Sequence, residues 1–137
     1  MTTALVACGR KKQGHPAPAC DLYTSDLFQK SRAYAERVGD AWFVLSAKHG
    51  LLEPTRVVEP YDLSLYDLNR GERGAWADRV LQTLALSTPP LSSFVVLAGS
   101  RYRSDLVPAL ELAGHHVTVP LAGLGIGRQL AWLKGQL

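Results

Sequence analysis

The sequence predicts an α/β protein, a three-layer sandwich in which helices cover both faces of a mostly parallel four-stranded sheet. Four short apolar runs indicate strands, and continuously apolar runs are typical of strands that are buried on both faces. Helical segments separate these runs, and right-handed crossovers between them give a mainly parallel sheet. At 137 residues, the chain is predicted to form one domain over residues 1–137.

The first half of the chain is predicted to contain two strands and one helix. Residues 3–7 are an apolar run that ends at a Cys-Gly pair, and residues 41–45 are a second apolar run. Between them, Ser25 is a suitable helix N-cap, and apolar residues at helical spacing continue to Val38. Residues 10–21 are rich in basic residues, glycine and proline, which predicts a loop.

Residues 47–69 are predicted to form a long irregular segment. They include Pro54 and Pro60 and have few apolar residues at periodic positions. A segment of this length without regular structure in a small domain is usually functional or disordered. Its scattered apolar residues indicate packing, so we expect a functional segment.

The second half of the chain is predicted to alternate helices with strands. Helices are expected over 71–86, 105–113 and 127–137, where apolar residues recur at helical spacing. Strands are expected over 94–98 and 116–121, which are rich in β-branched residues. The resulting order of elements is the basis for the predicted sheet.

The composition excludes several classes of protein. A hydrophobic content of 47% and a charged content of 20% are typical of a globular protein rather than a disordered one. No apolar run approaches the ~20 residues that cross a bilayer, so we expect no membrane association. The first seven residues are too short for the core of a signal peptide, which favours a cytoplasmic location. The net charge of +3 indicates nucleic acid only weakly.

Polar stretches that contain glycine or serine follow the predicted strands. In such a protein they meet at the carboxyl ends of the strands, where α/β sheets bind their ligands. Their positive charge predicts an anion, so DNA or a nucleotide is the expected partner. Tyr102 could stack on a base or belong to the core, and the last stretch, 123–128, resembles a dinucleotide loop only loosely. The expected binding residues are Cys8, Gly9, Arg10, Lys11, Lys12, Ser46, Tyr61, Gly99, Ser100, Arg101 and Tyr102.

Two groups of side chains are candidates for acid–base chemistry. Lys48 and His49 are adjacent at a strand end, so one could hold an anion while the other moves a proton. Glu59, Tyr61 and Asp62 provide two carboxylates and a phenol within four residues. The alternatives stay open: His49 could be an ordinary loop residue, and Asp62 could cap a turn.

We expect neither a cofactor nor a metal ion. Cys8, His15, Cys20 and His49 could be drawn as a zinc site, but their spacing matches no common zinc motif. Two cysteines do not make a disulfide framework, and a reducing cytosol would keep them as thiols.

Three motifs carry a resemblance to known proteins. They are Leu22–Phe28, Ser46–Leu52 (Ser-Ala-Lys-His-Gly-Leu-Leu) and Glu59–Asp62. On these motifs the chain resembles, over nearly its whole length, a family of small bacterial and phage domains of unknown function. It is more distantly similar to the YaaA peroxide-stress family, whose members are linked to DNA protection. That similarity implies a fold related to uracil-DNA glycosylases and to enzymes that excise or exchange nucleobases.

The favoured hypothesis is an N-glycosidase, similar to a DNA glycosylase, that excises a possibly modified base in a stress response or in phage defence. A transition state with oxocarbenium character needs a carboxylate, for which Asp62 is the first candidate and Glu59 the second. His49 or Lys48 would stabilise the departing base.

Two other hypotheses stay open, because the chain lacks the water-positioning motif of uracil-DNA glycosylases. One is a non-catalytic domain that binds nucleic acid or a nucleotide, in which the same basic residues would serve. The other is a hydrolase that acts on a phosphorylated sugar or nucleoside.

Overall fold

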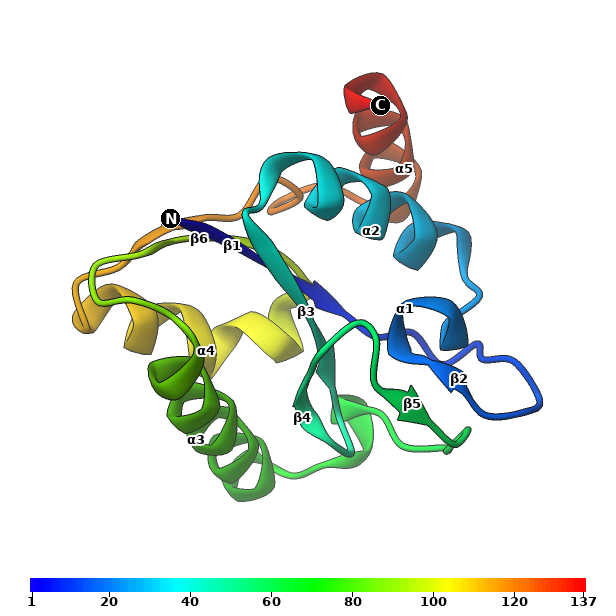
Figure 1. The fold of residues 1–137 in the computed structure, drawn as a ribbon, viewed down its shortest axis with the longest axis horizontal. Helices are drawn as coiled ribbons and strands as arrows, with labels where there is room; N and C mark the ends of the chain where they lie inside the picture. The colour runs from blue at the N-terminus through cyan, green and yellow to red at the C-terminus, as the bar shows by residue number, and fades with distance from the viewer.

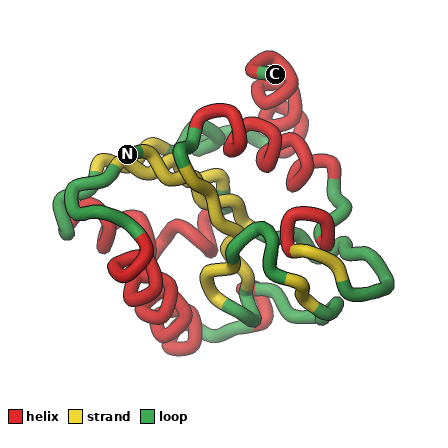
Figure 2. Tube along the Cα trace, in the orientation of Figure 1, coloured by secondary structure: helices red, strands yellow, loops and turns green.

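A computed structural model describes residues 1–137 and shows a five-stranded mixed sheet with helices on both faces (Figure 1, Figure 2). The order of the strands in the sheet is β4-β3-β1-β6-β7. The α/β class and the helical layers on both faces are thereby confirmed. The strands of this sheet are β1 (Thr2–Ala7), β3 (Ala41–Ser46), β4 (Gly50–Leu52), β6 (Ser93–Leu97) and β7 (His116–Thr118).

The prediction of a mostly parallel four-stranded sheet is wrong in the number of strands. Four strands pair in parallel, but the fifth, β4, pairs antiparallel with β3. A short turn over residues 47–49 joins the two strands. Gly50 then has a φ of 70°, a backbone conformation that other residues rarely adopt. Because β4 is only three residues long, no alternating pattern reveals it in the sequence.

Two helices cover each face of the sheet (Figure 1). Ala4 and Val6 of β1 belong to the core on one face, whereas Leu5 belongs to the core on the other. The central strand is therefore buried on both sides, as its continuous apolar run predicts. One face is covered by α2 (Asp26–Val38) and α5 (Ile126–Gln136), and the other by α3 (Arg70–Ser87) and α4 (Ser100–Leu112).

Helix α4 begins at Ser100, earlier than the predicted start at residue 105. Gly99 is its N-cap, so Arg101 and Tyr102 lie in the first helical turn and not in a loop. The buried side chains of α4 are Tyr102, Leu106 and Leu110, so the first turn continues the helical spacing that the predicted start at residue 105 missed. None of the helices is long and apolar enough to cross a membrane.

The two segments predicted as loops contain short elements and pack on each other at the carboxyl ends of the parallel strands (Figure 1). Strands β2 and β5 pair antiparallel, and the backbone N–H of Ala19 donates to the carbonyl of Arg56 at 2.8 Å. We call residues 10–24 and 53–69 together the cap. Its elements are β2 (Ala17–Pro18), α1 (Ala19–Leu22), β5 (Val57–Val58) and a 3-10 turn (Leu65–Asp67).

Candidate functional site

A cavity of about 180 Å³ lies where β1 and β6 end. Cys8 and Gly9 line it after β1, and Gly99 lines it after β6. Ser25, the N-cap of α2, also lines it, so two helices begin at its wall. Free backbone N–H groups at helix N-termini favour anions. Phe28 and other apolar side chains complete a mostly apolar lining.

A second cavity, of about 210 Å³, adjoins the first. The two share lining residues, and Arg10 and Ser64 add polar groups to the second. Each volume is smaller than the ~300–1,000 Å³ of a typical small-molecule pocket, so neither would hold a whole nucleotide. Together they suit two parts of one ligand. The shared lining residues are Cys8, Gly9, Tyr66 and Tyr102.

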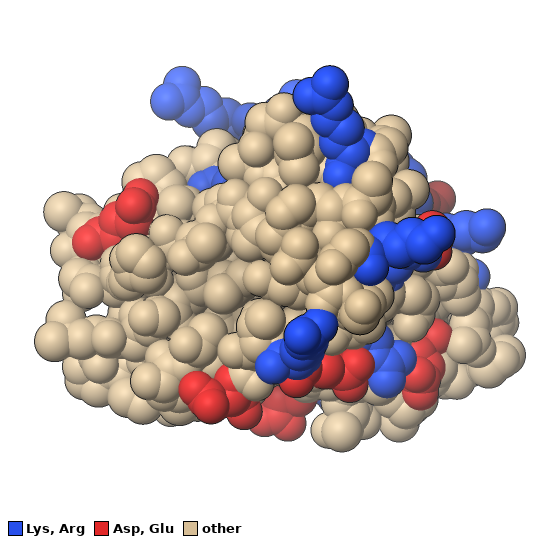
Figure 3. Space-filling view, turned by 90° about the horizontal axis from the view of Figure 1, so that it is seen from above, with Lys and Arg blue, Asp and Glu red and all other residues tan.

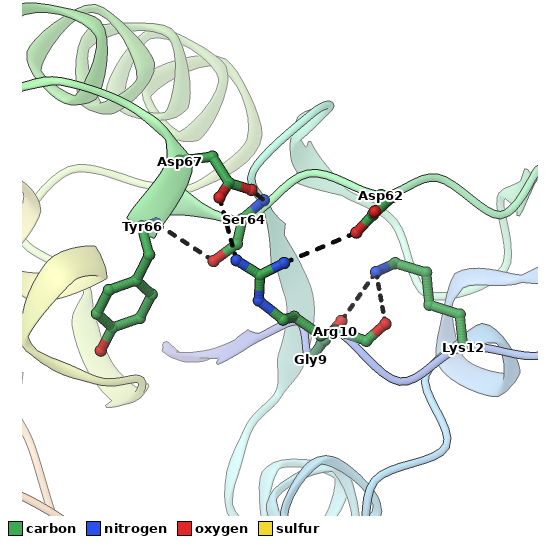
Figure 4. Close-up of polar contacts among 7 residues, drawn as sticks. All are labelled: Gly9, Arg10, Lys12, Asp62, Ser64, Tyr66 and Asp67. Carbon is green, nitrogen blue, oxygen red and sulfur yellow. Dashed lines mark hydrogen bonds and ion pairs between the residues drawn. The ribbon is translucent and has the colours of Figure 1, made fainter.

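The Arg10 guanidinium lies between two carboxylates of the cap (Figure 4). Its Nη2 donates to Asp67 Oδ1 at 3.1 Å, and its Nη1 lies 3.7 Å from Asp62 Oδ1. Asp67 also accepts the backbone N–H of Ser64 at 2.9 Å in a capping box. That backbone hydrogen bond, together with Arg10, lowers the pKa of Asp67 below its usual value. Arg10 therefore ties the two segments of the cap to each other.

Lys12 folds back over its own loop (Figure 4). Its Nζ donates to the carbonyl oxygens of Gly9 at 3.1 Å and Arg10 at 3.0 Å. It also lies 4.5 Å from the centre of the Tyr61 ring, a cation–π distance. Partial burial lowers the pKa of Lys12. Lys12 thus shapes the loop in addition to adding charge to it.

A chain of buried hydroxyl groups lies beneath the cap. The Tyr61 hydroxyl is 2.6 Å from Ser46 Oγ on one side and 2.6 Å from the Tyr23 hydroxyl on the other. Ser46 Oγ also accepts the backbone N–H of His49 at 3.1 Å. Burial raises the pKa of Tyr23 to about 12 and raises the pKa of Tyr61 as well. Both phenols therefore stay neutral near pH 7. Their hydrogen bonds join Ser46 of β3 to both segments of the cap.

His49 lies beside this chain and lines neither cavity. Its ring meets the edge of the Tyr61 ring, with centroids 5.4 Å apart. Burial, Arg56 and Lys48 lower the pKa of His49 below 6.5. A neutral imidazole accepts a proton more readily than it donates one. The expected stabilisation of a departing base by His49 stays a prediction, and the structure places this residue outside the lining of both cavities.

The lowered pKa of His49 predicts how stability depends on pH. Because the unfolded chain takes up this proton near pH 6.5 and the folded chain only below it, acidification from pH 7.5 to 5 favours unfolding. We expect His49→Asn to lose less free energy of unfolding over this range than the native protein. Urea unfolding at each pH measures the difference. An NMR titration that places His49 at or above pH 6.5 would contradict the prediction.

Tyr102 belongs to the core, and its hydroxyl faces the cavities. Its side chain is 7% exposed, and its ring packs edge-on against Trp76 at 5.5 Å between centroids. The hydroxyl lies 3.3 Å from Cys8 Sγ. Burial raises its pKa, so Tyr102 offers a neutral hydroxyl and not an open ring face for stacking.

Tyr66 presents the ring face that Tyr102 does not. It is 64% exposed, lines both cavities, and lies 5.2 Å from the Arg101 guanidinium. Several expected binding or catalytic residues are exposed and line neither cavity. These are Lys11, Lys48, Glu59, Asp62, Ser100 and Arg101, although Lys48 Nζ lies 5.8 Å from the Tyr61 ring.

The sequence interpretation missed Tyr66, Asp67, Ser25 and Tyr23. The Ser64-x-x-Asp67 spacing is a capping-box pattern and indicates a turn at this point. No local pattern indicates that Tyr23 contacts Tyr61, because the two lie in separate halves of the cap. On the face seen in Figure 3, basic side chains are dispersed and acidic ones lie among them.

Comparison with known proteins places the chain in a family. Residues 3–135 match the family of unknown function DUF6884. Over 138 residues, the chain is 31% identical to "Uncharacterized protein YfjM" of Bacillus subtilis (strain 168), with 95% of this chain and 91% of that protein covered. No solved structure matches the chain significantly. The expected membership in a domain family of unknown function is confirmed: the chain belongs to DUF6884.

Proposed function

We propose that the protein binds a nucleotide, free or flipped out of a nucleic-acid strand, in the two adjoining cavities and cleaves its N-glycosidic bond. The observation that carries this proposal is the arrangement of the two cavities. One is mostly apolar, the other contains Arg10, and the exposed ring of Tyr66 borders both. The distant similarity of the chain to the YaaA family, which implies a fold related to enzymes that excise nucleobases, is in line with the same assignment.

The base would lie in the cavity between α2 and α4. The Tyr66 ring is 64% exposed, so it has surface on which a base can stack, although the Arg101 guanidinium lies 5.2 Å from the ring centre. Ser25 and Gln129 line the same cavity and offer polar groups to the edge of the base. Arg10 in the adjoining cavity would face the phosphate, because a guanidinium pairs well with phosphate oxygens.

The reaction would be a hydrolysis. The bond from the sugar C1′ to the base nitrogen breaks with its electron pair going to the base, and a carboxylate stabilises the positive charge that develops on the sugar. The oxygen of one water molecule bonds to C1′. One hydrogen of that water stays on the new hydroxyl group, and the other passes to the base. Asp62 is the candidate carboxylate, since it is 96% exposed and held only loosely by Arg10 at 3.7 Å.

The test is a search for released base. The protein is incubated with nucleoside monophosphates and with single- and double-stranded DNA and RNA, unmodified and modified, and free bases are separated by chromatography. Release of a base together with an abasic sugar supports the proposal. If no substrate loses a base although one binds at the cavities, glycosidic cleavage is excluded and only binding remains.

Non-catalytic binding is the second candidate function, and one observation favours it. Asp62 and Asp67 both contact Arg10, so neither of these carboxylates is an unpaired group buried in a cavity. A binding domain needs no free carboxylate, and the basic and aromatic groups would serve it unchanged. The same assay separates the two functions, because a binding domain leaves every glycosidic bond intact.

Replacing Tyr66 tests the stacking position. We expect Tyr66→Ala to weaken nucleotide binding by roughly 5- to 100-fold, because stacking on an aromatic ring contributes about 1–3 kcal/mol per base. Tyr66→Phe keeps the ring and should bind nearly as the native protein does. Affinity is measured by calorimetry with a nucleoside monophosphate. Equal affinities of the alanine and phenylalanine variants would remove Tyr66 from the binding site.

A further inference from the structure

We propose that the Asp62 carboxylate occupies the position of the ligand's phosphate in the free protein, and that phosphate replaces it between Arg10 and Lys12. This inference rests on the proposed function and specifies where the phosphate lies: at Arg10, which lines the second cavity, and beside Lys12, which does not line it. It makes Asp62 an internal counterion that leaves Arg10 when a phosphate monoester arrives.

The two carboxylates on Arg10 are held very differently. Asp67 makes a hydrogen bond of 3.1 Å to Nη2, and its other oxygen accepts the Ser64 backbone N–H. Asp62 is 3.7 Å from Nη1, beyond hydrogen-bond distance, and no other group holds its 96% exposed side chain. Exposed ion pairs of this kind contribute little to stability. Asp67 therefore positions the guanidinium, and Asp62 can leave it at little cost.

Asp62 also lies beside a second cation. Figure 4 shows the Lys12 ammonium and the Arg10 guanidinium on two sides of the Asp62 carboxylate. Asp62 is close enough to Lys12 to act on it electrostatically. A lysine ammonium has three N–H donors, and the carbonyls of Gly9 and Arg10 use two of the Lys12 donors. The third donor and Arg10 Nη1 are thus available to one anion.

The position is prepared for an anion before any ligand binds. Asp67 fixes one side of the guanidinium, and the backbone carbonyl of Arg10 is fixed by Lys12. Little side-chain freedom is then lost on binding, which favours affinity. A phosphate has a higher charge and three oxygens, so it can bind both cations at once. The Asp62 carboxylate makes only one ion pair, at 3.7 Å from Arg10.

Inorganic phosphate is the probe for the experiment, and NMR titration of the full-length protein at low ionic strength measures its dissociation constant. Asp62→Asn should bind phosphate about two- to fivefold more tightly than the native protein, since an exposed ion pair that competes for Arg10 is lost. Asp78→Asn, an exposed change on α3, alters the net charge equally and is the matched control.

A double-mutant cycle then tests whether the gain acts through Arg10. In an Arg10→Gln background, Asp62→Asn should give a smaller gain than it gives in the native background, because only Lys12 still faces Asp62. Both side chains are more than half exposed, so these variants are expected to fold, and thermal unfolding verifies it. If Asp62→Asn binds phosphate no more tightly than Asp78→Asn, or keeps its full gain without Arg10, the inference is wrong. Base release plays no part in this readout, so failure of the glycosidase proposal would be seen separately.

Discussion

Trp76→Ala is expected to lower the free energy of unfolding by about 3–5 kcal/mol, the usual cost of truncating a buried aromatic side chain. Trp76 is 1% exposed, and its indole N–H donates to the Ser46 carbonyl at 2.8 Å. Its ring also supports Tyr102 edge-on. The substitution leaves a void beneath the cavities and an unpaired carbonyl at the end of β3. Since natural domains are stable by only ~5–15 kcal/mol, this is a large fraction of the total.

Trp76→Phe separates the two contributions. It keeps most of the packing and removes the indole hydrogen bond, so it should cost about 1–3 kcal/mol. Leu86→Ala, on the exposed side of the same helix, should change stability by less than ~0.5 kcal/mol. Urea unfolding measures all three variants. A loss below ~1 kcal/mol for Trp76→Ala would show that this side chain does not support the site as described.

Asp62→Asn is expected to slow base release by roughly 100- to 1,000-fold, the range seen when one group that stabilises charge in a transition state is removed from an active site. The amide has nearly the same size as the carboxylate but carries no charge to stabilise the developing cation on the sugar. The substitution should lower kcat. It should not weaken substrate binding, because the same variant is expected to bind phosphate more tightly. Misfolding would lower both the turnover and the affinity, so slower turnover together with tighter phosphate binding cannot result from misfolding.

Single-turnover experiments with the substrate that loses its base measure the rate of base release in each variant. Asp78→Asn is again the control, and its rate should match that of the native protein. If Asp62→Asn releases base at the native rate, Asp62 is not the carboxylate, and Glu59→Gln tests the second candidate. Glu59 forms no ion pair with Arg10, whereas Asp62 lies 3.7 Å from it, so substitution of Glu59 alone should have the smaller effect.

The elements that sequence predicted well are those whose burial produces a pattern. Continuous apolar runs located β1, β3 and β6 to within a residue or two, because both faces of these strands are covered. Strand β4 was not predicted, because it has only three residues and depends on a turn that ends at Gly50. The β2–β5 pair depends on two distant segments meeting, which no local pattern encodes.

The candidate site was predictable in its location and less so in its contacts. Strand-end glycines and basic residues indicated the edge of the sheet where the cavities lie. The roles of individual residues depend on partners far along the chain. Arg10 meets Asp67 and Tyr23 meets Tyr61, so their hydrogen bonds follow from tertiary packing alone. The burial of the Tyr102 ring could not be predicted either, because it depends on packing against Trp76.

The position of β1 at the centre of the sheet has a consequence for synthesis of the chain. β1 is translated well before β6, yet its residues Thr2–Val6 pair with Ser93–Leu97 of that strand, which leave the ribosome much later. Until then, one edge of an apolar strand has no neighbour, and unpaired edges of this kind invite association with other chains. The nascent protein therefore carries its most aggregation-prone edge before the cavities exist, since β6 supplies both the missing strand and one wall of the site.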